Sequence, residues 1–436
     1  MIEKAEHIVR TLTRLGHEAY FVGGCVRDLL MGRECTDIDI VTSCRPEEVC
    51  RIFPVTIPVG AKFGVILVRH EGESFEVATF RSDQCYIDGR RPSAVAFSTR
   101  EEDVKRRDFT VNAMLYDPDS KKVIDLAGGR EDLKAGIIRA VGDAAARFEE
   151  DRLRMLRAVR FAAGLDFTLE PETHRAVKKL AGSITDISME RISDELQNML
   201  TGPRPARALR LLDETGLLGP VLPEVSALKG VAQPKKFHPE GDVWEHTLLC
   251  FEKADPPLTA TLAFAVLFHD IGKPPTFQIA DRIRFNHHDR VGARMAAKIC
   301  RRLKMPARDA RRIEELVQKH IDFMNVQKMR ESTLKRFLLM DNFDEHLELH
   351  RIDCEASHNM TENVDFCKQK LHEFEEEFNA PELPPPLLNG NEIMDLGIPE
   401  GPEIGQIKDE MLDAQLEGRL KTRKEAEKFV REKLKS

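Results

Sequence analysis

The chain lacks the features that would assign it to a secreted, membrane or cysteine-built class of protein. Its nine cysteines are scattered and include no Cys-x-x-Cys pair, which argues for reduced thiols and against a structural zinc site built on cysteine. No apolar run is long enough to span a bilayer. Glu3 and Glu6 stand where a signal peptide would be basic and then apolar. We therefore expect a cytoplasmic protein without a membrane partner.

The chain also lacks an excess of positive charge. Its formal net charge is −8 over 436 residues, which by itself disfavours a nucleic-acid-binding protein. Binding a nucleic acid needs only a local basic face, however. The arginine- and lysine-rich segments 204–210, 301–312 and 421–435 are candidates for such a face, although each is equally typical of a solvated helix surface.

The hydrophobic pattern changes near residue 140, and no internal repeat is present. Before that point short β-rich runs alternate with helical pieces, whereas helical periodicity recurs from Phe148 to about Glu375. A proline-rich break at 380–386 and a charged terminal helix follow. We predict an α+β fold with a small mixed head over residues 1–140 and a long all-helical body. The body divides into a neck over 141–230, a further domain over 231–375 and a tail over 376–436.

A glycine pair separates a predicted strand from a predicted helix near the start of the chain. The strand covers residues 19–22, Gly23 and Gly24 form the turn, and the helix follows from residue 26. A glycine turn before a helix offers bare backbone amides to a triphosphate, and Arg27 adds a positive charge. This segment therefore predicts a phosphate-binding turn.

Asp37 and Asp39 lie one residue apart on the next predicted strand, residues 37–41. Because side chains alternate along a strand, both carboxylates point the same way and repel each other unless a cation lies between them. Hard oxygen ligands suit Mg²⁺, which bridges carboxylates and substrate phosphates. Two aspartates alone are also common in solvated hairpins, but together with the glycine turn they predict nucleotidyl transfer.

The combination resembles the signature of the polymerase-beta-like nucleotidyltransferase superfamily, and within it the tRNA CCA-adding enzymes and bacterial poly(A) polymerases. The resemblance implies a third carboxylate on a neighbouring strand, for which Glu76 fits, although a solvated strand residue would look the same. With Asp37 and Asp39 it would complete a two-metal Mg²⁺ site. The implied reaction is attack of an RNA 3′-hydroxyl on an α-phosphate, which releases pyrophosphate.

Two further segments carry the resemblance through residues 18 to about 225. Residues 106–113 read Arg-Arg-Asp-Phe-Thr-Val-Asn-Ala and resemble a family motif that contacts ribose and phosphates, which implies roles for Arg107, Asp108 and Asn112. Residues 150–161 resemble the Glu-Asp-x-x-Arg element with which class II CCA-adding enzymes select CTP and ATP.

The second of these segments is expected to form one helix, with Asp151, Arg154 and Arg157 at positions i, i+3 and i+6 on a broad face. Aspartate accepts a hydrogen bond from an exocyclic amine and arginine donates to ring nitrogens and carbonyls. A fixed pair can therefore read the edge of an incoming base. Arg160 is included among the expected nucleotide-binding residues. A solvated salt-bridge helix is the alternative.

A second set of polar residues lies in the helical body. The run His-Asp-Ile-Gly-Lys at 269–273 resembles the HD superfamily of metal-dependent phosphohydrolases. The resemblance implies four ligands of a divalent metal, namely His246, His269, Asp270 and Asp353, and His288 and His320 could hold a second ion. Histidine with carboxylate suits transition metals as well as Mg²⁺.

The resemblance implies an enzyme that adds the 3′-terminal CCA, or its terminal A, to tRNA from CTP and ATP without a template. The partners would be the tRNA 3′ end, which the tail could contact, and the two nucleotides. Residues 83–97 resemble the flexible loop needed for AMP addition, which disfavours an enzyme that adds only CC. CCA-adding and A-adding enzymes are not separated by these features. A poly(A) polymerase, a protein that is primarily an HD phosphohydrolase, and a non-catalytic RNA-binding protein are the remaining alternatives.

Overall fold

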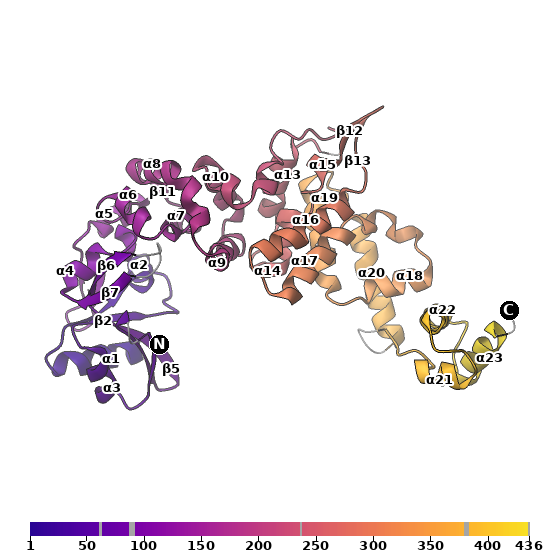
Figure 1. Ribbon diagram of the computed structural model, residues 1–436, viewed down its shortest axis with the longest axis horizontal. Helices are drawn as coiled ribbons and strands as arrows, with labels where there is room; N and C mark the ends of the chain where they lie inside the picture. Colours follow the sequence, from indigo (N-terminus) through magenta and orange to yellow (C-terminus); the bar gives the residue numbers. More distant parts are fainter. Residues whose placement is uncertain (61–62, 87–91, 236–237, 379–382, 435–436) are drawn as a thin grey trace. The chain divides into compact units, whose positions relative to one another are not determined.

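The computed structural model describes residues 1–60, 63–86, 92–235, 238–378 and 383–434. The chain divides into two compact units (Figure 1). The first consists of residues 1–227, 255–263 and 299–306, and the second of 228–254, 264–298 and 307–436. Of the loop predicted within 83–97, residues 87–91 lie outside the described residues, as do 380–382 of the proline-rich break.

The head of the first unit is built on a mixed sheet. Among the described residues, seven strands take the order β3-β4-β5-β2-β1-β8-β9. β2 runs antiparallel to β1 and parallel to β5. A separate antiparallel pair joins β6 (Arg81–Tyr86) and β7 (Pro92–Phe97). The strands of the main sheet are β1 (Ala19–Val22), β2 (Asp39–Thr42), β3 (Thr56–Gly60), β4 (Val65–His70), β5 (Glu73–Thr79), β8 (Leu115–Asp117) and β9 (Lys122–Ile124).

One face of this sheet forms a hydrophobic core with helices α1 (Ile2–Arg14) and α3 (Pro46–Ile52). Ile40 of β2 and Val77 of β5 are partners in the parallel register, and both belong to this core. Because side chains alternate along a strand, Asp39 and Glu76, each one residue earlier, point to the opposite face. The pattern that buries Ile40 and Val77 therefore brings the two carboxylates to the same place.

The rest of the first unit is mainly helical. α7 (Leu153–Leu165) packs against α9 (Met189–Leu200) and α10 (Pro205–Glu214). Short strands β10 (Ile137–Ile138) and β11 (Thr168–Leu169) pair in parallel. The other helical elements are α2 (Gly24–Leu30), α4 (Arg100–Lys105), η2 (Thr110–Asn112), α5 (Gly129–Ala135), α6 (Ala144–Glu150), α8 (Pro171–Leu180), η3 (Ala181–Asp186), α11 (Leu218–Val221) and α12 (Pro223–Ser226).

The helix expected through residue 151 is interrupted there. α6 ends at Glu150 and α7 begins at Leu153, so Asp151 has an extended backbone with φ −144° and ψ 104°. The prediction that Asp151 shares a helix face with Arg154 and Arg157 is therefore wrong. Its carboxylate accepts a hydrogen bond from the backbone N–H of Leu153 at 3.1 Å, which satisfies an amide at the start of α7 as a capping residue does.

The second unit is largely helical, as predicted. An antiparallel hairpin of β12 (Phe277–Ile279) and β13 (Ile283–Phe285) is an exception to the expected all-helical body. It is stabilised by cross-strand packing of Phe277 on Phe285, whose ring centroids lie 5.8 Å apart. The helices that form or enter this unit are α13 (Val243–Lys253), α14 (Ala260–Phe268), α15 (Lys273–Thr276), α16 (His288–Arg302), α17 (Ala307–Lys319), η4 (Asp322–Lys328), α18 (Glu331–Leu338), α19 (Phe343–Ala356), α20 (Glu362–Phe378), α21 (Gly390–Asp395), α22 (Pro402–Leu416) and α23 (Arg423–Lys433).

Within the described part of the chain, no helix has both the length and the apolar composition needed to cross a bilayer.

Candidate active site and metal centre

The carboxylate of Asp39 lies close enough to those of Asp37 and Glu76, at the polar face of the head sheet, to be affected by their charges. Burial, together with the charges of Asp37 and Glu76, raises the pKa of Asp39 to about 6, and Arg107 opposes this shift. Asp37 lies two residues before the start of β2 and is exposed, so the strand predicted over 37–41 begins later than expected. Negative charges held this close are stabilised by a bound cation.

The glycine turn lies directly beside this carboxylate group. Gly23 has φ +79°, a left-handed conformation that glycine adopts without strain. A Cβ atom at this position would come within 3.5 Å of Asp39 Oδ2. Gly24 begins helix α2. The turn therefore brings backbone amides next to the carboxylates.

Arg27 is a buried arginine of α2, with 8% of its surface exposed. Its Nη1 donates to Asn112 Oδ1 at 2.7 Å, and its Nε and Nη2 each donate to the Asp28 carboxylate at 3.0 Å. Two residues that the sequence predicts to bind nucleotide, Arg27 and Asn112, are therefore in direct contact.

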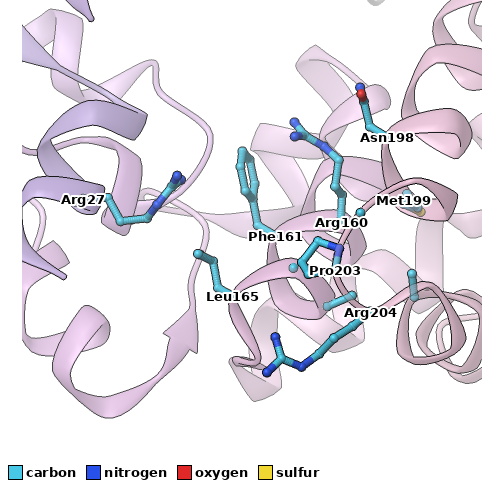
Figure 2. Close-up of a pocket in the computed structure, with 12 residues that line it drawn as sticks. Arg27, Arg160, Phe161, Leu165, Asn198, Met199, Pro203 and Arg204 are labelled. Carbon is cyan, nitrogen blue, oxygen red and sulfur yellow. The ribbon is translucent and has the colours of Figure 1, made fainter. Parts of the chain in front are cut away.

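A cavity of about 230 Å³ adjoins Arg27 in the first unit (Figure 2). Phe161 of α7 lines it, and Figure 2 shows Arg27 and Arg160 on opposite sides of the ring. The guanidinium carbons of Arg27, Arg157 and Arg160 lie 5.5, 5.2 and 4.4 Å from the ring centroid, within the range of cation–π attraction. The cavity thus combines an aromatic face with a concentration of positive charge.

The remaining predicted residues of the head form ion pairs. Arg107 donates to Asp103, with Nη2 3.0 Å from Oδ2. Asp108 accepts from Arg157 Nε and Nη2 at 2.8 and 2.6 Å. Burial favours a higher pKa for Asp108, but the Arg157 guanidinium outweighs it and lowers the pKa. Arg160 Nε donates to Glu195 of α9 at 2.7 Å. These pairs fix arginine orientations along α7.

The Arg154 backbone N–H donates to the Asp151 carbonyl oxygen at 3.0 Å, whereas the two side chains are bonded to other groups. Arg191 of α9 donates to both Asp151 oxygens, with Nη1–Oδ1 at 3.1 Å and Nη2–Oδ2 at 2.7 Å. Arg154 donates to Glu150 Oε2 at 2.8 Å and to the backbone carbonyl of Arg106 at 2.7 Å. The side chains of the pair predicted to read a base are therefore held by neighbouring groups rather than by each other.

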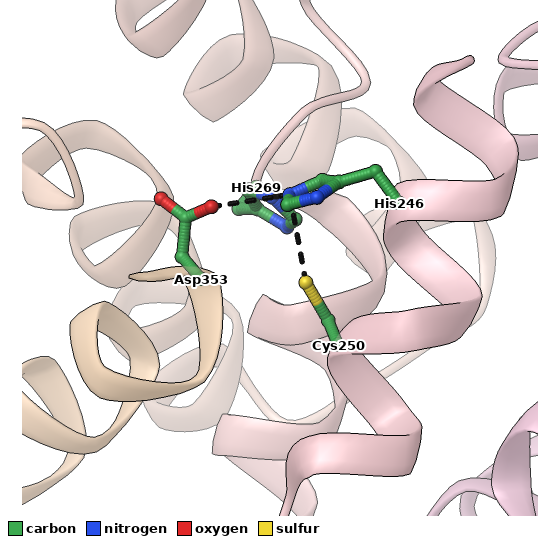
Figure 3. A group of neighbouring side chains, drawn as sticks. All are labelled: His246, Cys250, His269 and Asp353. Atoms are coloured by element: carbon green, nitrogen blue, oxygen red, sulfur yellow. Dashed lines mark hydrogen bonds and ion pairs between the residues drawn. The ribbon is translucent and has the colours of Figure 1, made fainter. Parts of the chain in front are cut away.

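A cluster of histidines and aspartates lies in the second unit. His246 Nε2 of α13 is 3.3 Å from His269 Nε2 and 3.1 Å from Asp353 Oδ1 of α19 (Figure 3). Asp270 Oδ2 is 3.3 Å from His269 Nε2. His246, His269 and Asp270 are buried, with at most 2% of their surface exposed. The four ligands predicted from the sequence are therefore brought together.

His288 and His320 extend the cluster. Their Nε2 atoms are 3.3 Å apart, and His288 Nε2 is 3.7 Å from Asp270 Oδ1. Burial and the nearby His288 and His269 lower the pKa of His320 to about 4, which favours the neutral imidazole that binds metals. The Nδ1 atoms of both rings contact backbone carbonyls, at 2.9 and 2.6 Å. This leaves each Nε2 free to face Asp270.

The His-Asp-Ile-Gly-Lys run at 269–273 explains how the start of α16 comes close to Asp270. Lys273 Nζ is 2.6 Å from Asp270 Oδ2 and donates to Gln233 Oε1 at 2.6 Å. A Cβ atom at Gly272 would lie 2.1 Å from the carbonyl oxygen of His288, so only glycine lets α16 begin at this point. A cavity of about 550 Å³ opens onto the cluster, and Asp270, Lys273, His288, His320 and Asp353 line it.

Comparison with known proteins places the chain in a family. Residues 19–139 match the family model of the poly A polymerase head domain, residues 166–229 that of the probable RNA and SrmB-binding site of polymerase A, and residues 243–349 that of the HD domain. The crystal structure of the Bacillus stearothermophilus CCA-adding enzyme in complex with CTP is similar to the whole chain. Its TM-score is 0.76 at 30% identity, covering 100% of this chain and 98% of that one. The chain belongs to the CCA-adding enzyme family.

One further relative agrees with this membership, and a second solved structure shares the fold. The CCA-adding enzyme of Geobacillus thermodenitrificans is 52% identical over 216 residues, which are 49% of this chain and 53% of that protein. The chain thus spans about half the length of the curated relatives that it matches. The Thermotoga maritima CCA-adding enzyme complexed with tRNA shares the fold, with a TM-score of 0.60 at 20% identity over 98% of this chain and 94% of that one.

Within this family assignment, both the head and the HD domain belong to metal-using families, and the His/Asp cluster lies in the HD region. Sequence reasoning missed Arg191, Phe161 and Cys250. Arg191 stands forty positions from its partner Asp151, so no local pattern indicates the pair. Cys250 carried a signal, because it follows His246 by one helical turn and so lies on the same face of α13.

Proposed function

We propose that the chain is a tRNA nucleotidyltransferase that adds the 3′-terminal CCA, or its terminal A, from CTP and ATP without a nucleic-acid template. The observation that carries the proposal is the convergence of Asp37, Asp39 and Glu76 beside the Gly23 turn and Arg107. The similarity to CCA-adding enzymes, one of them described in complex with CTP, supports the choice of nucleotide and acceptor.

The carboxylate group fits a divalent cation, because burial and then the charges of Asp37 and Glu76 raise the pKa of Asp39, and these hard oxygen ligands suit Mg²⁺. Asp37, Asp39 and Glu76 would hold Mg²⁺, which would neutralise charge on the α-phosphate. The backbone amides at Gly23 and Gly24 would bind the phosphates. Arg107 supplies further positive charge beside the carboxylates.

Nucleotide binding is proposed to use the arginine-rich surface around α2 and α7. Arg27, which Asn112 holds in place, and Arg160 contribute positive charge beside Phe161. Arg157 takes its orientation from Asp108. A phosphate or ribose that enters between these groups would meet donors already fixed by ion pairs, which lowers the entropy lost on binding.

Base selection is proposed to rest on Asp151 and Arg154. Arg191 holds the carboxylate of Asp151 and Glu150 holds the guanidinium of Arg154. Each side chain is therefore presented in one orientation, which is what discrimination between base edges requires.

The experiment that tests the transferase proposal supplies labelled CTP or ATP separately. The acceptors are tRNAs that end before CCA, after the first C, or after both. A CCA-adding enzyme labels the first two acceptors with CTP and the third with ATP. An A-adding enzyme labels only the third. Labelling of none, with the fold intact, would contradict the proposal, and long untemplated A tracts would indicate a poly(A) polymerase instead.

A second activity, hydrolysis of a phosphoester by the HD domain, is proposed from the cavity that opens onto Asp270, His288 and His320. A divalent metal held by the His/Asp cluster would supply an activated water at neutral pH, and a transition metal suits these ligands. A 2′,3′-cyclic phosphate at a damaged RNA end is the proposed substrate, since such an end lacks the hydroxyl that nucleotide addition needs.

The test of this second activity compares native protein with His269→Ala. Turnover of a 2′,3′-cyclic phosphate that depends on added metal and disappears in His269→Ala is expected. Bound metal without turnover of phosphoesters would leave a structural role for the site. Turnover that survives in His269→Ala would place the activity elsewhere.

The tail over residues 376–436 is proposed to contact the tRNA. Helix α23 carries Arg423, Lys424 and Lys428 among its exposed residues. Positive side chains of this kind bind phosphates without reading sequence. A tail charge-reversal variant should bind tRNA more weakly, with a smaller salt dependence.

A further inference from the structure

Cys250 lies inside the HD cluster, although the HD resemblance implies no role for it. It occupies α13 one turn after His246 and is 1% exposed. Its Sγ is 3.5 Å from His246 Nε2, and Figure 3 shows it directed at the same ring nitrogen that faces Asp353. Among the described residues, the ligand atoms of His246, Cys250, His269 and Asp353 all lie within 4.8 Å of one another.

The spacing of these atoms matches a tetrahedral metal site. With bonds of about 2.0–2.3 Å to nitrogen, oxygen and sulfur, neighbouring donors of a tetrahedron stand roughly 3.3–3.6 Å apart. From His246 Nε2 the observed distances are 3.3 Å to His269 Nε2, 3.1 Å to Asp353 Oδ1 and 3.5 Å to Cys250 Sγ. The other three distances between donor atoms are at most 4.8 Å.

Contacts outside the cluster orient the imidazoles toward its centre. His246 Nδ1 is 2.8 Å from Glu240 Oε1, and His269 Nδ1 is 2.8 Å from the carbonyl oxygen of Val266. An acceptor at Nδ1 holds the proton there and leaves the Nε2 lone pair for a metal, as in ligating histidines generally. Both rings are thus arranged to bind one ion together with Cys250.

We propose that Cys250, in place of Asp270, is the fourth ligand of the first HD-domain ion and binds it as a thiolate, so that His246, Cys250, His269 and Asp353 form a closed four-coordinate site. This inference rests on the metal site proposed above for the HD domain. Coordination releases the thiol proton to solvent, and the sulfur ligand makes the site selective for zinc or a similarly soft divalent ion over Mg²⁺.

The two halves of the cluster then have different properties. The first site has all four positions filled by protein atoms, which is typical of a structural zinc site. The second group, Asp270, His288 and His320, offers fewer protein ligands and lines the cavity of about 550 Å³. An ion there keeps a position open for water or substrate. The lack of a Cys-x-x-Cys pair argues only against a zinc site built on cysteine alone. The proposed site combines one cysteine with two histidines and one aspartate.

The test uses the full chain, stripped of metal with a chelator and titrated with Co²⁺. A thiolate ligand produces a ligand-to-metal charge-transfer band in the near ultraviolet, which nitrogen and oxygen ligands do not. We expect this band with the first equivalent and its loss in Cys250→Ser. The zinc affinity of the variant should fall by at least about tenfold, the lower bound for loss of even an outer partner of a metal ligand.

Two cysteines provide matched controls. Cys354 lies one helical turn after His350 in the same unit, with Sγ 3.6 Å from His350 Nε2. Cys44 belongs to a separate group with His17 and Glu48. Cys354→Ser and Cys44→Ser should keep the band. A band that disappears with either control instead of Cys250→Ser would overturn the assignment.

X-ray absorption of the zinc-loaded native protein decides the case if Cys250→Ser does not fold. One sulfur at about 2.3 Å from the first zinc is expected, and a first shell of nitrogen and oxygen alone would overturn the proposal. If Co²⁺ binds without a charge-transfer band, Cys250 is not a ligand, and the proposed HD metal site still stands. Failure of the native protein to bind Co²⁺ or zinc would contradict both this inference and the proposed metal site.

Discussion

Arg191 and Asp151 form a two-pronged ion pair that joins α9 to the start of α7. Nη1 lies 3.1 Å from Oδ1 and Nη2 lies 2.7 Å from Oδ2. The side chains are 18% and 17% exposed, so the pair is shielded from most solvent screening. A residue proposed to read the incoming base is therefore positioned by a second helix.

Arg191→Lys should relax the choice among nucleoside triphosphates while leaving the fold intact, because an ammonium cannot hold both carboxylate oxygens in the planar geometry of a guanidinium. The ratio of kcat/KM for CTP and ATP to that for UTP and GTP should fall by about tenfold, equivalent to one base hydrogen bond of about 1–2 kcal/mol. Arg175→Lys, at an exposed ion pair with Glu172, is the matched control. An unchanged ratio in Arg191→Lys would show that this ion pair does not position the base reader.

Asp37→Ala and Asp39→Ala should each reduce nucleotide addition by at least about a hundredfold, because each removes a ligand that would hold the Mg²⁺ needed to neutralise charge in the transition state. Far-ultraviolet circular dichroism should be unchanged, since neither side chain belongs to the hydrophobic core. Asp119→Ala, at an exposed ion pair with Arg10 in the same head, is the control and should retain activity. Near-normal addition by either site variant would exclude the carboxylate group from catalysis.

Gly272→Ala should disrupt the second group of the HD cluster. The added Cβ would lie 2.1 Å from the His288 carbonyl oxygen and 2.7 Å from the amide nitrogen of Gly292, so α16 must move away from Asp270. We expect loss of one bound metal ion and a fall in stability of at least about 1–3 kcal/mol, as for overpacked core positions. Metal content and thermal unfolding measure the two effects.

The control for that experiment is Gly405→Ala within α22, where a Cβ would meet nothing within 4 Å. It should be neutral or stabilise the protein by about 0.5–1 kcal/mol, since alanine favours a helix over glycine. Equal behaviour of the two variants would mean that the contact at Gly272 does not position His288.

Acid should destabilise the second unit through His346. Burial, assisted by Lys319 and opposed by Glu315, lowers the pKa of His346 to about 4. The unfolded chain, with a histidine pKa of about 6.5, then binds a proton more readily than the folded one. The contribution of His346 is therefore fully present above pH 6.5 and is lost as the pH falls from there toward 4.

Between pH 7 and pH 5, the free energy of unfolding of the native protein should fall by roughly 1–2 kcal/mol more than that of His346→Gln. The single tryptophan, Trp244 of α13, is buried in the same unit and reports its unfolding by fluorescence. His372→Gln, at a side chain 74% exposed, is the control. A native-like pH dependence in His346→Gln would assign the acid sensitivity to other groups.

Local patterns in the sequence predicted a large part of the fold and of the candidate site. The period of two along a strand predicted that Asp37 and Asp39 point the same way, whereas the family resemblance added Glu76 on a neighbouring strand. β1 covers residues 19–22 as predicted. The His-Asp-Ile-Gly-Lys run likewise indicated adjacent metal ligands, because the relation of His269 to Asp270 is set by neighbouring backbone.

Only the tertiary structure decided which partners each side chain meets. Asp151 left the helix predicted for it because its carboxylate is bonded to the Leu153 amide and to Arg191 of another helix. Cys250 lies within 4.8 Å of the Asp353 carboxylate because α13 packs against α19, which carries Asp353. Periodicity along one segment determines which way a side chain points, whereas the atoms it reaches depend on packing between segments that are distant in sequence, and no local pattern contains that information.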